Sequence, residues 1–458
     1  MRQNKFRILL GLVLLAVSLT FSGCGRKQVV EKYKVDLEIW GVMDDSDAYR
    51  EIFENYRDLN PNVGKITYKK QRIETYEKDL IDALASGNGP DIFLIHNTWL
   101  SAFSNKISPA PKEILTEQEF HKNFIDVAAE DFISEGKIFA VPLSVSSLAL
   151  YYNKDLFNAE GIAEPPKTWD EFLAVTEKIT KVDMMGEINP SGAALGTAKN
   201  INRSTDILTM LMLQNGVQMR DKSGRVDFGK NEKAQKALEF YTNFAKNSAP
   251  NYSWNSRMHY SVDAFSEGTL AMMINYPWQI EAIRSKAPKL NFAIAEVPQM
   301  LPASPANYAN YWGYTVSGNK IITPDPKSKT KPITNDLRLK EAWNFLAYLT
   351  TNNNGQVAPT SATAVVKKAP TGFDPAENYL EKTNQVAARR DLIEKQKSDL
   401  YLGVFAKGNL VAKNWLQKNP LAIETIFADM IDDVNRGAAS IAEALSSATE
   451  KIKMAETE

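Results

Sequence analysis

Apolar and polar residues alternate along the chain with two periods, and segments of the two kinds follow one another. Residues 35–40, 64–68 and 91–95 have the two-residue period or the short apolar run of strands. Between them, apolar residues recur at helical spacing from Tyr49 to Tyr56 and from Tyr76 to Leu84. Strands that alternate with helices in this way predict an α/β fold with a mostly parallel sheet covered on both faces.

The same alternation restarts after Pro142 and continues to the end of the chain. The pattern predicts strands at 147–152, 270–274 and 313–317, and helices opening at Thr168 and near Ser440 and spanning about 204–214, 232–246 and 337–351. Asp44 to Asp47 offer N-caps for the first helix. Pro and Gly cluster at 87–90, 298–305 and 355–375, where we expect linkers or hinges.

The first 24 residues have the pattern of a lipoprotein export signal. Arg2, Lys5 and Arg7 precede the apolar run 8–17, and the only cysteine, Cys24, follows Ser22 and Gly23. The apolar run is shorter than the roughly 20 residues that a membrane-spanning helix needs. We therefore predict a signal peptide over 1–23, lipidation of Cys24, and a polar tether over 24–34 on the extracytoplasmic face of the cell membrane.

Composition narrows the classes of function. A net charge of -1 provides no field to attract nucleic acid, and the single cysteine excludes an internal disulfide. His96, His121 and His259 are far apart and form no zinc motif, so we expect no metal and no cofactor. A serine–lysine pair at Ser317 and Lys320 lacks the companion motifs of serine acylases, and we expect no enzymatic activity.

Four segments resemble one known family in order along the chain. They are 84–93, then 140–143 continued by 150–157 and 165–172, then 265–278, and finally 437–445. Together they resemble the sugar-type (family 1) extracellular solute-binding proteins of ABC importers. The resemblance extends over the chain that follows the signal, and the second and third segments are its most specific part.

The resemblance implies a periplasmic-binding-protein-like fold of two α/β lobes joined by a multi-crossover hinge, with the ligand cleft between them. On this reading the first lobe comprises 35–145 and 306–355, and the second comprises 146–305 and 356–458 with the C-terminal helices. We place the chain crossings near 143–148, 303–312 and 351–365, where Pro-rich breaks interrupt the α/β pattern.

The implied function is capture of a carbohydrate, with an oligosaccharide expected, and its delivery to the transmembrane subunits of an ABC permease. We expect a monomer that is held at the membrane by its lipid and binds no nucleic acid. Two alternatives stay open: the same fold with a non-sugar solute such as a polyamine or a glycerol phosphate, and a secreted glycoside hydrolase with a carboxylate pair in the cleft.

A sugar site needs aromatic platforms and a few directed hydrogen-bonding groups. Trp278 leads the candidates because it ends the third family-like segment, where the resemblance implies a stacking ring. The further candidates lie at strand ends or at the expected re-entry into the first lobe, or are aromatic residues near the predicted cleft: Trp40, Asp44, Asn97, Trp99, Tyr276, Trp312, Gly313 and Trp415.

The stretch 376–420 matches nothing in the family cleanly. Its Arg389–Arg390 pair has two readings, a site for an anionic sugar or a solvated helix face, and we favour the solvated face.

Overall fold

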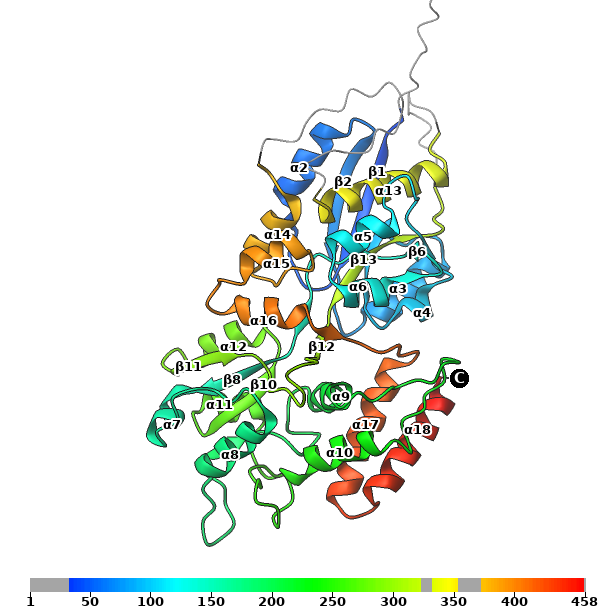
Figure 1. Cartoon of the computed structure of the whole chain (residues 1–458). Coiled ribbons are helices and arrows are strands. Elements are labelled where there is room, and N and C mark those ends of the chain that lie inside the picture. The colour runs from blue at the N-terminus through cyan, green and yellow to red at the C-terminus, as the bar shows by residue number, and fades with distance from the viewer. Residues whose placement is uncertain (1–32, 323–331, 353–371, 457–458) are drawn as a thin grey trace, which may run out of the picture.

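The computed structural model describes residues 33–322, 332–352 and 372–456, and these form two α/β lobes, one above the other in Figure 1. The two-lobed α/β architecture expected from the sequence is confirmed. The predicted signal, Cys24 and nearly all of the tether lie outside the described residues. Within the described ranges, no helix is both long enough and apolar enough to cross a membrane.

The first lobe is built on a five-stranded mixed sheet. Its order is β2 (Val63–Lys70), β1 (Val35–Gly41), β3 (Ile92–His96), β13 (Trp312–Ser317) and β4 (Ile107–Ser108). β1 runs parallel to both β2 and β3, as predicted. β13 is antiparallel to β3, because the chain enters this strand on its return from the second lobe. The expectation of parallel pairing is therefore wrong for β13.

Short helices surround this sheet. They are η1 (Ser46–Tyr49), α2 (Arg50–Leu59), α3 (Tyr76–Ala85), α4 (Leu100–Phe103), α5 (Glu117–Asn123), α6 (Asp126–Phe132) and α13 (Asn335–Thr350), with a hairpin of β5 (Ile133–Ser134) and β6 (Lys137–Ile138). The apolar stripe of α2 buries Ile52, Phe53 and Tyr56, as its periodicity predicts. Asp45 occupies the N-cap of η1 without a side-chain cap bond, so the expected capping is wrong there.

The second lobe has a four-stranded sheet in the order β11 (Phe292–Ala295), β8 (Ala149–Asn153), β10 (Leu270–Asn275) and β9 (Ser191–Ala193). Every residue of β10 is buried, which explains its continuous apolar run. β8 is antiparallel to both β10 and β11, so this sheet is mostly antiparallel and not parallel as expected.

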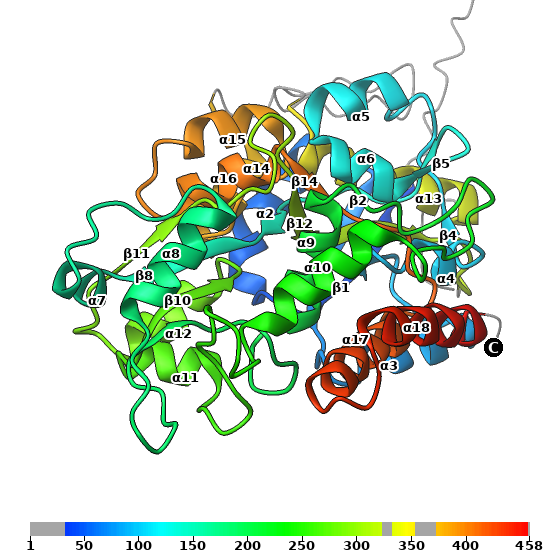
Figure 2. The same cartoon turned by 60° about the horizontal axis from the view of Figure 1, so that its bottom comes forward.

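The helices of the second lobe are α7 (Lys154–Ala159), α8 (Trp169–Ile179), α9 (Ser204–Gln214), α10 (Glu232–Asn243), α11 (Ser261–Ser266), α12 (Gln279–Lys286), α17 (Pro420–Asn435) and α18 (Ile441–Ala455). The predicted start of α8 is confirmed, because Thr168 and Glu171 form a reciprocal capping box. Figure 2 shows the last two helices, α17 and α18, side by side next to α10.

A third sheet of very short strands joins the lobes. β12 (Asn307–Asn310) lies between β7 (Ser146–Ser147), to which it is antiparallel, and β14 (Ala412–Lys413), to which it is parallel. The first two strands lie at the crossings expected near 143–148 and 303–312. The third expected crossing, near 351–365, falls mainly on 353–371, outside the described residues, and the third strand of the hinge is β14.

The segment before β14 packs differently from the prediction. α14 (Pro375–Thr383) contacts α13 and η1, and α15 (Arg390–Gln396) contacts α5, all in the first lobe (Figure 1). α16 (Leu402–Asn409) contacts the hinge strands. α16 also contacts β8 of the second lobe. The assignment of all of 356–458 to the second lobe is therefore wrong for α14 and α15.

Arg389 is a second correction in this segment. Its side chain is 2% exposed and forms ion pairs with Asp374 and Asp391, so it is not part of a solvated face. The neighbouring Arg390 is partly exposed and pairs with Asp126 at 2.6 Å. Arg389 thus fixes the loop before α15 to the N-terminal end of α14, which helps to explain why this segment stays on the first lobe.

Candidate ligand-binding cleft

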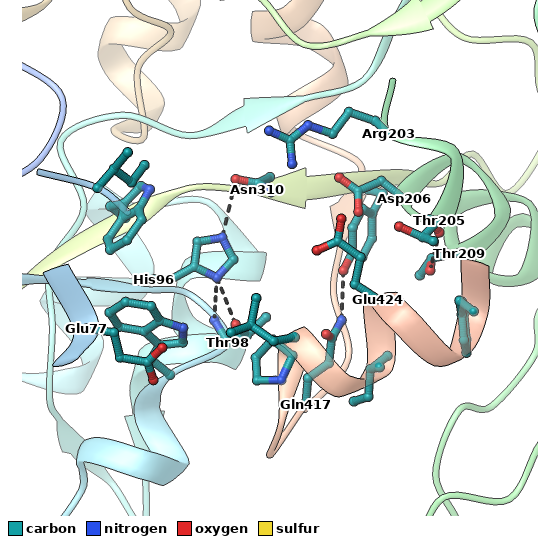
Figure 3. Close-up of a pocket in the computed structure, with 18 of the residues that line it drawn as sticks. Glu77, His96, Thr98, Arg203, Thr205, Asp206, Thr209, Asn310, Gln417 and Glu424 are labelled. Atoms are coloured by element: carbon teal, nitrogen blue, oxygen red, sulfur yellow. Dashed lines mark hydrogen bonds between the residues drawn. The ribbon is translucent and has the colours of Figure 1, made fainter. Parts of the chain in front are cut away.

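A cleft of about 500 Å³ opens between the two lobes, and residues from both lobes and from the hinge line it (Figure 3). This volume lies in the range of small-molecule sites. It lies where the C-terminal end of β3, the start of β13 and the N-terminal half of α9 meet the hinge. Strand and helix ends of this kind present backbone groups and side chains to a ligand rather than to the core.

The first-lobe wall is aromatic. His96 ends β3 and pairs in register with Trp312, which starts β13, so two neighbouring strands deliver their rings to the same point. The ring centroids of His96 and Trp312 are 5.3 Å apart, and those of Trp99 and Trp312 are 5.1 Å apart at an interplanar angle of 77°. Edge-to-face packing of this kind holds the rings in place before any ligand arrives.

His96 is a polar group within this aromatic wall. Its Nδ1 lies 2.8 Å from the Thr98 hydroxyl, and its Nε2 lies 3.3 Å from Asn310 Oδ1 of the hinge. Burial lowers the pKa of His96 to about 4, and the positive charge of Arg203 contributes to that shift. The imidazole is therefore neutral near pH 7, so each ring nitrogen acts as a donor or an acceptor according to the tautomer.

The second-lobe wall is polar and charged. The N-terminal half of α9 presents Thr205, Asp206 and Thr209, and Arg203 lies just before the helix. Asp206 accepts a hydrogen bond of 2.9 Å from the hydroxyl of Tyr276. Burial raises the pKa of Asp206 to about 6, although the positive charge of Arg203 and the Tyr276 bond both oppose that rise.

The hinge forms the floor of the cleft, and two further segments form its mouth. Tyr308 and Asn310 come from β12, and Tyr308 accepts a bond of 2.9 Å from Gln417. At the mouth, Ile73, Glu74, Glu77 and Lys78 at and before the start of α3 lie opposite Leu421 and Glu424 of α17. Over the whole lining, four carboxylates accompany two cations, so the cleft is acidic on balance.

Two of the nine residues that the sequence singled out, Trp99 and Trp312, line this cleft. Tyr276 and Trp278 are not among the residues that line the cleft; their rings are stacked with centroids 4.4 Å apart, with Tyr276 buried and Trp278 exposed. The Arg203 guanidinium carbon lies 5.4 Å from the Trp278 ring centroid and 5.9 Å from that of Tyr276. The structure thus places an arginine beside the leading candidate platform, whose side chain is still 41% exposed.

The other five candidates lie outside the cleft lining, and each of them has a structural role elsewhere. Trp40 donates a bond of 2.7 Å to Glu38. Asp44 accepts bonds from Tyr379 and Gln385, at 2.6 and 3.1 Å, and so ties α14 to the first lobe.

Asn97 is 3% exposed and bonds Asp131 at 3.1 Å. Gly313 makes room for a neighbour within the lobe, because a Cβ there would lie 2.5 Å from the Phe132 ring. Trp415 is 7% exposed and stacks on Phe427 in the second-lobe core. Placement of Trp40, Asp44, Asn97, Gly313 and Trp415 in the site is therefore not supported by the geometry.

The sequence reasoning missed Arg203, Asp206 and Asn310, and it considered His96 only as a zinc ligand. Asn310 lies within the predicted crossing at 303–312, so its position in the hinge was a usable signal. Arg203 and Asp206 flank the predicted start of α9, but nothing in the local pattern indicates that this helix points its first turn at the first lobe. Among the described residues, no cluster of three His, Cys, Asp or Glu side chains is arranged to hold a metal.

Comparison with known proteins places this cleft in a family. Residues 51–371 match the family described as bacterial extracellular solute-binding protein. The maltotriose-binding protein of Pyrococcus abyssi is 25% identical over 331 residues, which is 72% of this chain and 64% of that relative.

Two solved structures share the fold. The cyclic alpha-maltosyl-1,6-maltose binding protein from Arthrobacter globiformis has a TM-score of 0.71 at 17% identity, with 93% of this chain and 100% of that chain covered. A cyclo/maltodextrin-binding protein complexed with maltotetraose has a TM-score of 0.69 at 16% identity, with 93% and 98% covered. With a family match over more than half of its length, the chain belongs to the bacterial extracellular solute-binding proteins.

Proposed function

We propose that this protein captures an oligosaccharide in the cleft between its lobes and delivers it to the permease of an ABC importer. The observation that carries the proposal is the pairing of two unlike walls: Trp99 and Trp312 on one lobe face Arg203 and Asp206 on the other. A saccharide has apolar C–H faces and a rim of hydroxyl groups, and these two walls match those two surfaces. The protein performs no chemistry on its ligand in this proposal.

The similar proteins named above support a sugar as the ligand, because their names state maltotriose, cyclic maltosyl-maltose and maltodextrin. The acidic balance of the cleft argues against a glycerol phosphate, since a phosphate ligand favours a basic site. A polyamine would suit the carboxylates and the indole rings of Trp99 and Trp312, but its ammonium groups would meet the positive charge of Arg203, whereas a neutral sugar accepts hydrogen bonds from that residue.

Thermal unfolding of the mature domain with a ligand panel tests this function. A ligand that binds only the folded protein adds about 2.7 kcal/mol of stability at a hundredfold excess over its Kd. We expect the melting temperature to rise with linear or cyclic gluco-oligosaccharides and not with spermidine or glycerol phosphate. A rise with the amine or the phosphate alone would refute the carbohydrate, and release of shortened sugars would indicate a hydrolase instead.

Attachment to the membrane is a separate part of the proposal and rests on the lipobox-like end at Cys24. The polar residues after it provide a tether that lets the two lobes move near the permease. Replacing Cys24→Ala in the producing cell should release the protein to the soluble fraction and leave its ligand affinity unchanged. Retention in the membrane fraction would refute the anchor.

A further inference from the structure

Arg203 has an unusual backbone conformation for its residue type. Its φ of 63° and ψ of 29° place it in the left-handed region, immediately before the first residue of α9. Only three non-glycine residues among those described have a positive φ. Glycine, asparagine and aspartate are the usual occupants of this region, and an arginine there is strained. Backbone strain of this kind is concentrated at functional sites, where the surrounding structure maintains it.

The Arg203 side chain contacts two aromatic rings but keeps one N–H without a hydrogen-bond acceptor among the residues that the structure describes. Its guanidinium lies near the stacked rings of Tyr276 and Trp278, which position it by cation–π contact. Its Nε is buried and has no hydrogen-bond partner within the described part of the chain. A buried N–H that lacks an acceptor costs free energy, and a ligand oxygen that accepts from the guanidinium would recover some of that cost.

The position of Arg203 lets it act on both walls of the cleft. Its positive charge opposes the rise in the pKa of Asp206 on its own lobe. The same charge adds to the lowering of the pKa of His96 on the opposite lobe. Figure 3 shows the guanidinium projecting from the α9 side above Asn310, with Asp206 on the same side of the cleft. Arg203 therefore faces the space between the aromatic wall and the hinge, where a ligand lying on Trp312 would meet it.

The neighbouring groups define which ligand chemistry fits. Arg203 only donates hydrogen bonds, whereas an ionised Asp206 only accepts them. Two adjacent sugar hydroxyls supply both an acceptor and a donor, and so they satisfy this pair together. A carboxylate on the ligand would face Arg203 favourably but would lie close to Asp206 and Glu424 in a lining where acids outnumber bases.

We propose that Arg203 is the residue through which the second lobe binds the ligand, and that Arg203 with Asp206 selects a neutral saccharide by a pair of adjacent hydroxyl groups. This inference rests on the proposed carbohydrate function and assigns its specificity. It also gives the Tyr276–Trp278 pair a role that was not predicted, because these rings position the arginine by cation–π contact.

The positive φ of Arg203 makes glycine the best replacement for testing its side chain. Arg203→Gly removes the side chain and introduces the residue that suits a positive φ, so the free protein should melt at the same temperature or higher. Its affinity for the oligosaccharide that the wild type binds should fall by about thirtyfold or more, as expected for the loss of a charged hydrogen-bonding residue. Arg203→Lys keeps the charge but loses the planar fork, so it should lose about tenfold.

Arg257→Gln is the matched control. Arg257 lies on the same lobe, is exposed at 63%, and pairs with Glu187 away from the cleft, so its loss should leave affinity unchanged. Calorimetric titration with a neutral trisaccharide and with a uronate trisaccharide of the same linkage measures both affinity and selectivity. The wild type should prefer the neutral sugar, and Arg203→Gly should bind both weakly.

The outcomes separate the two proposals. Stable Arg203→Gly or Arg203→Lys with wild-type affinity would overturn the role of Arg203 while leaving the carbohydrate function in place. Tighter binding of the uronate than of the neutral sugar by the wild type would overturn the claimed selectivity. Failure of the wild type to bind any saccharide would overturn both the proposed function and this inference.

Discussion

The two walls of the cleft are built in opposite ways. On the first lobe, His96, Trp99 and Trp312 contact one another through their rings. His96 and Trp312 come from adjacent strands of one sheet, and Trp99 is the N-cap of α4, three residues after β3. On the second lobe, Arg203 and Asp206 come from the start of α9, and part of the guanidinium has no hydrogen-bond partner within the described chain. The rings of the first-lobe wall thus contact one another without a ligand, whereas the second-lobe wall keeps a hydrogen-bond donor that has no acceptor among the described residues.

This difference assigns different tasks to the lobes. A ligand shifts a two-lobed protein toward its closed form only through contacts that the closed form gains. The aromatic wall can hold a sugar face with the lobes apart, because its rings are already placed. The polar wall makes its contacts only when the second lobe reaches the same sugar, so we expect it to supply the free energy of closure.

The largest expected effect is on the aromatic wall. Trp312→Ala removes the ring that contacts both His96 and Trp99, and we expect binding to weaken by about 2–3 kcal/mol, roughly 30- to 150-fold. Calorimetric titration measures it. Trp415→Phe is the matched control, because that tryptophan lies in the second-lobe core, and it should keep its affinity. Binding within threefold of wild type by Trp312→Ala would show that this wall is not the platform.

The next effect is on the polar wall and depends on pH. A sugar hydroxyl donates to ionised Asp206 more strongly than to the protonated acid, so affinity should rise with pH through the pKa of about 6. Asp206→Asn should remove most of this rise and weaken binding at pH 7 by about 1.5–2 kcal/mol. His96 does not titrate in this window, because its pKa lies near 4.

Titrations at pH 5 and 7 compare this variant with Glu77→Gln. Glu77 also lines the cleft and has a pKa raised by burial, so it is the competing source of a pH effect. We expect Glu77→Gln to retain the wild-type dependence. If Glu77→Gln loses the pH dependence of affinity and Asp206→Asn keeps it, the titrating acceptor is Glu77 on the first lobe, and the second-lobe wall does not supply it.

A smaller effect concerns the pH dependence of folding stability, at a buried carboxylate beside the hinge. Asp131 of α6 accepts bonds from Tyr311 at 2.7 Å, Asn97 at 3.1 Å and Asn414, which follows β14, at 3.1 Å. Burial raises the pKa of Asp131 to about 7, and nearby Glu130 adds to the rise. Because the folded pKa lies above the unfolded one, protonation favours the fold, and this contribution is lost as pH increases through about 7.

Asp131→Asn should therefore match the wild type near pH 4, close to the unfolded pKa, and exceed its stability at pH 8 by about 1 kcal/mol or more. The amide fits because Asn414 Oδ1 is a buried acceptor without a partner in the described structure, and a turned Asn414 amide would present it to the new N–H. Urea unfolding at both pH values measures this, with Glu113→Gln, at an exposed carboxylate of the first lobe, as the control. An unchanged pH slope in Asp131→Asn would refute the assignment.

The smallest expected effect is at a residue that belongs to neither wall. Trp40→Phe removes a bond to Glu38 outside the cleft lining, and affinity should stay within about twofold of wild type. A larger loss in calorimetric titration would show that the first-lobe wall extends along β1 as far as Trp40.

Local patterns predicted the elements well, and the reason is visible in particular cases. The sequence placed α9 at 204–214 and the start of α8 at Thr168, because helix starts and periodicity are properties of neighbouring residues. It misplaced α14 and α15, because their attachment depends on bonds such as that between Tyr379 and Asp44, which are 335 residues apart.

The site was harder to predict for the same reason. Trp99 was found because it follows a strand, which the local pattern reveals, and Trp312 because the family resemblance placed the return into the first lobe there. Trp278 also follows a strand, but Arg203, 75 positions earlier, lies beside its ring, and no periodicity encodes that contact. Asn97 lies beside a cleft strand but points to Asp131, so its position in sequence was right and its direction was not.

The hinge has a practical consequence for measurement. Three chain segments cross between the lobes within one small sheet, β7–β12–β14, and their mutual hydrogen bonds oppose twisting and sliding of one lobe against the other. The remaining freedom approximates rotation about a single axis. One distance between a reporter dye on each lobe should then describe the whole movement, and with Cys24 replaced the chain has no other thiol to compete for labelling.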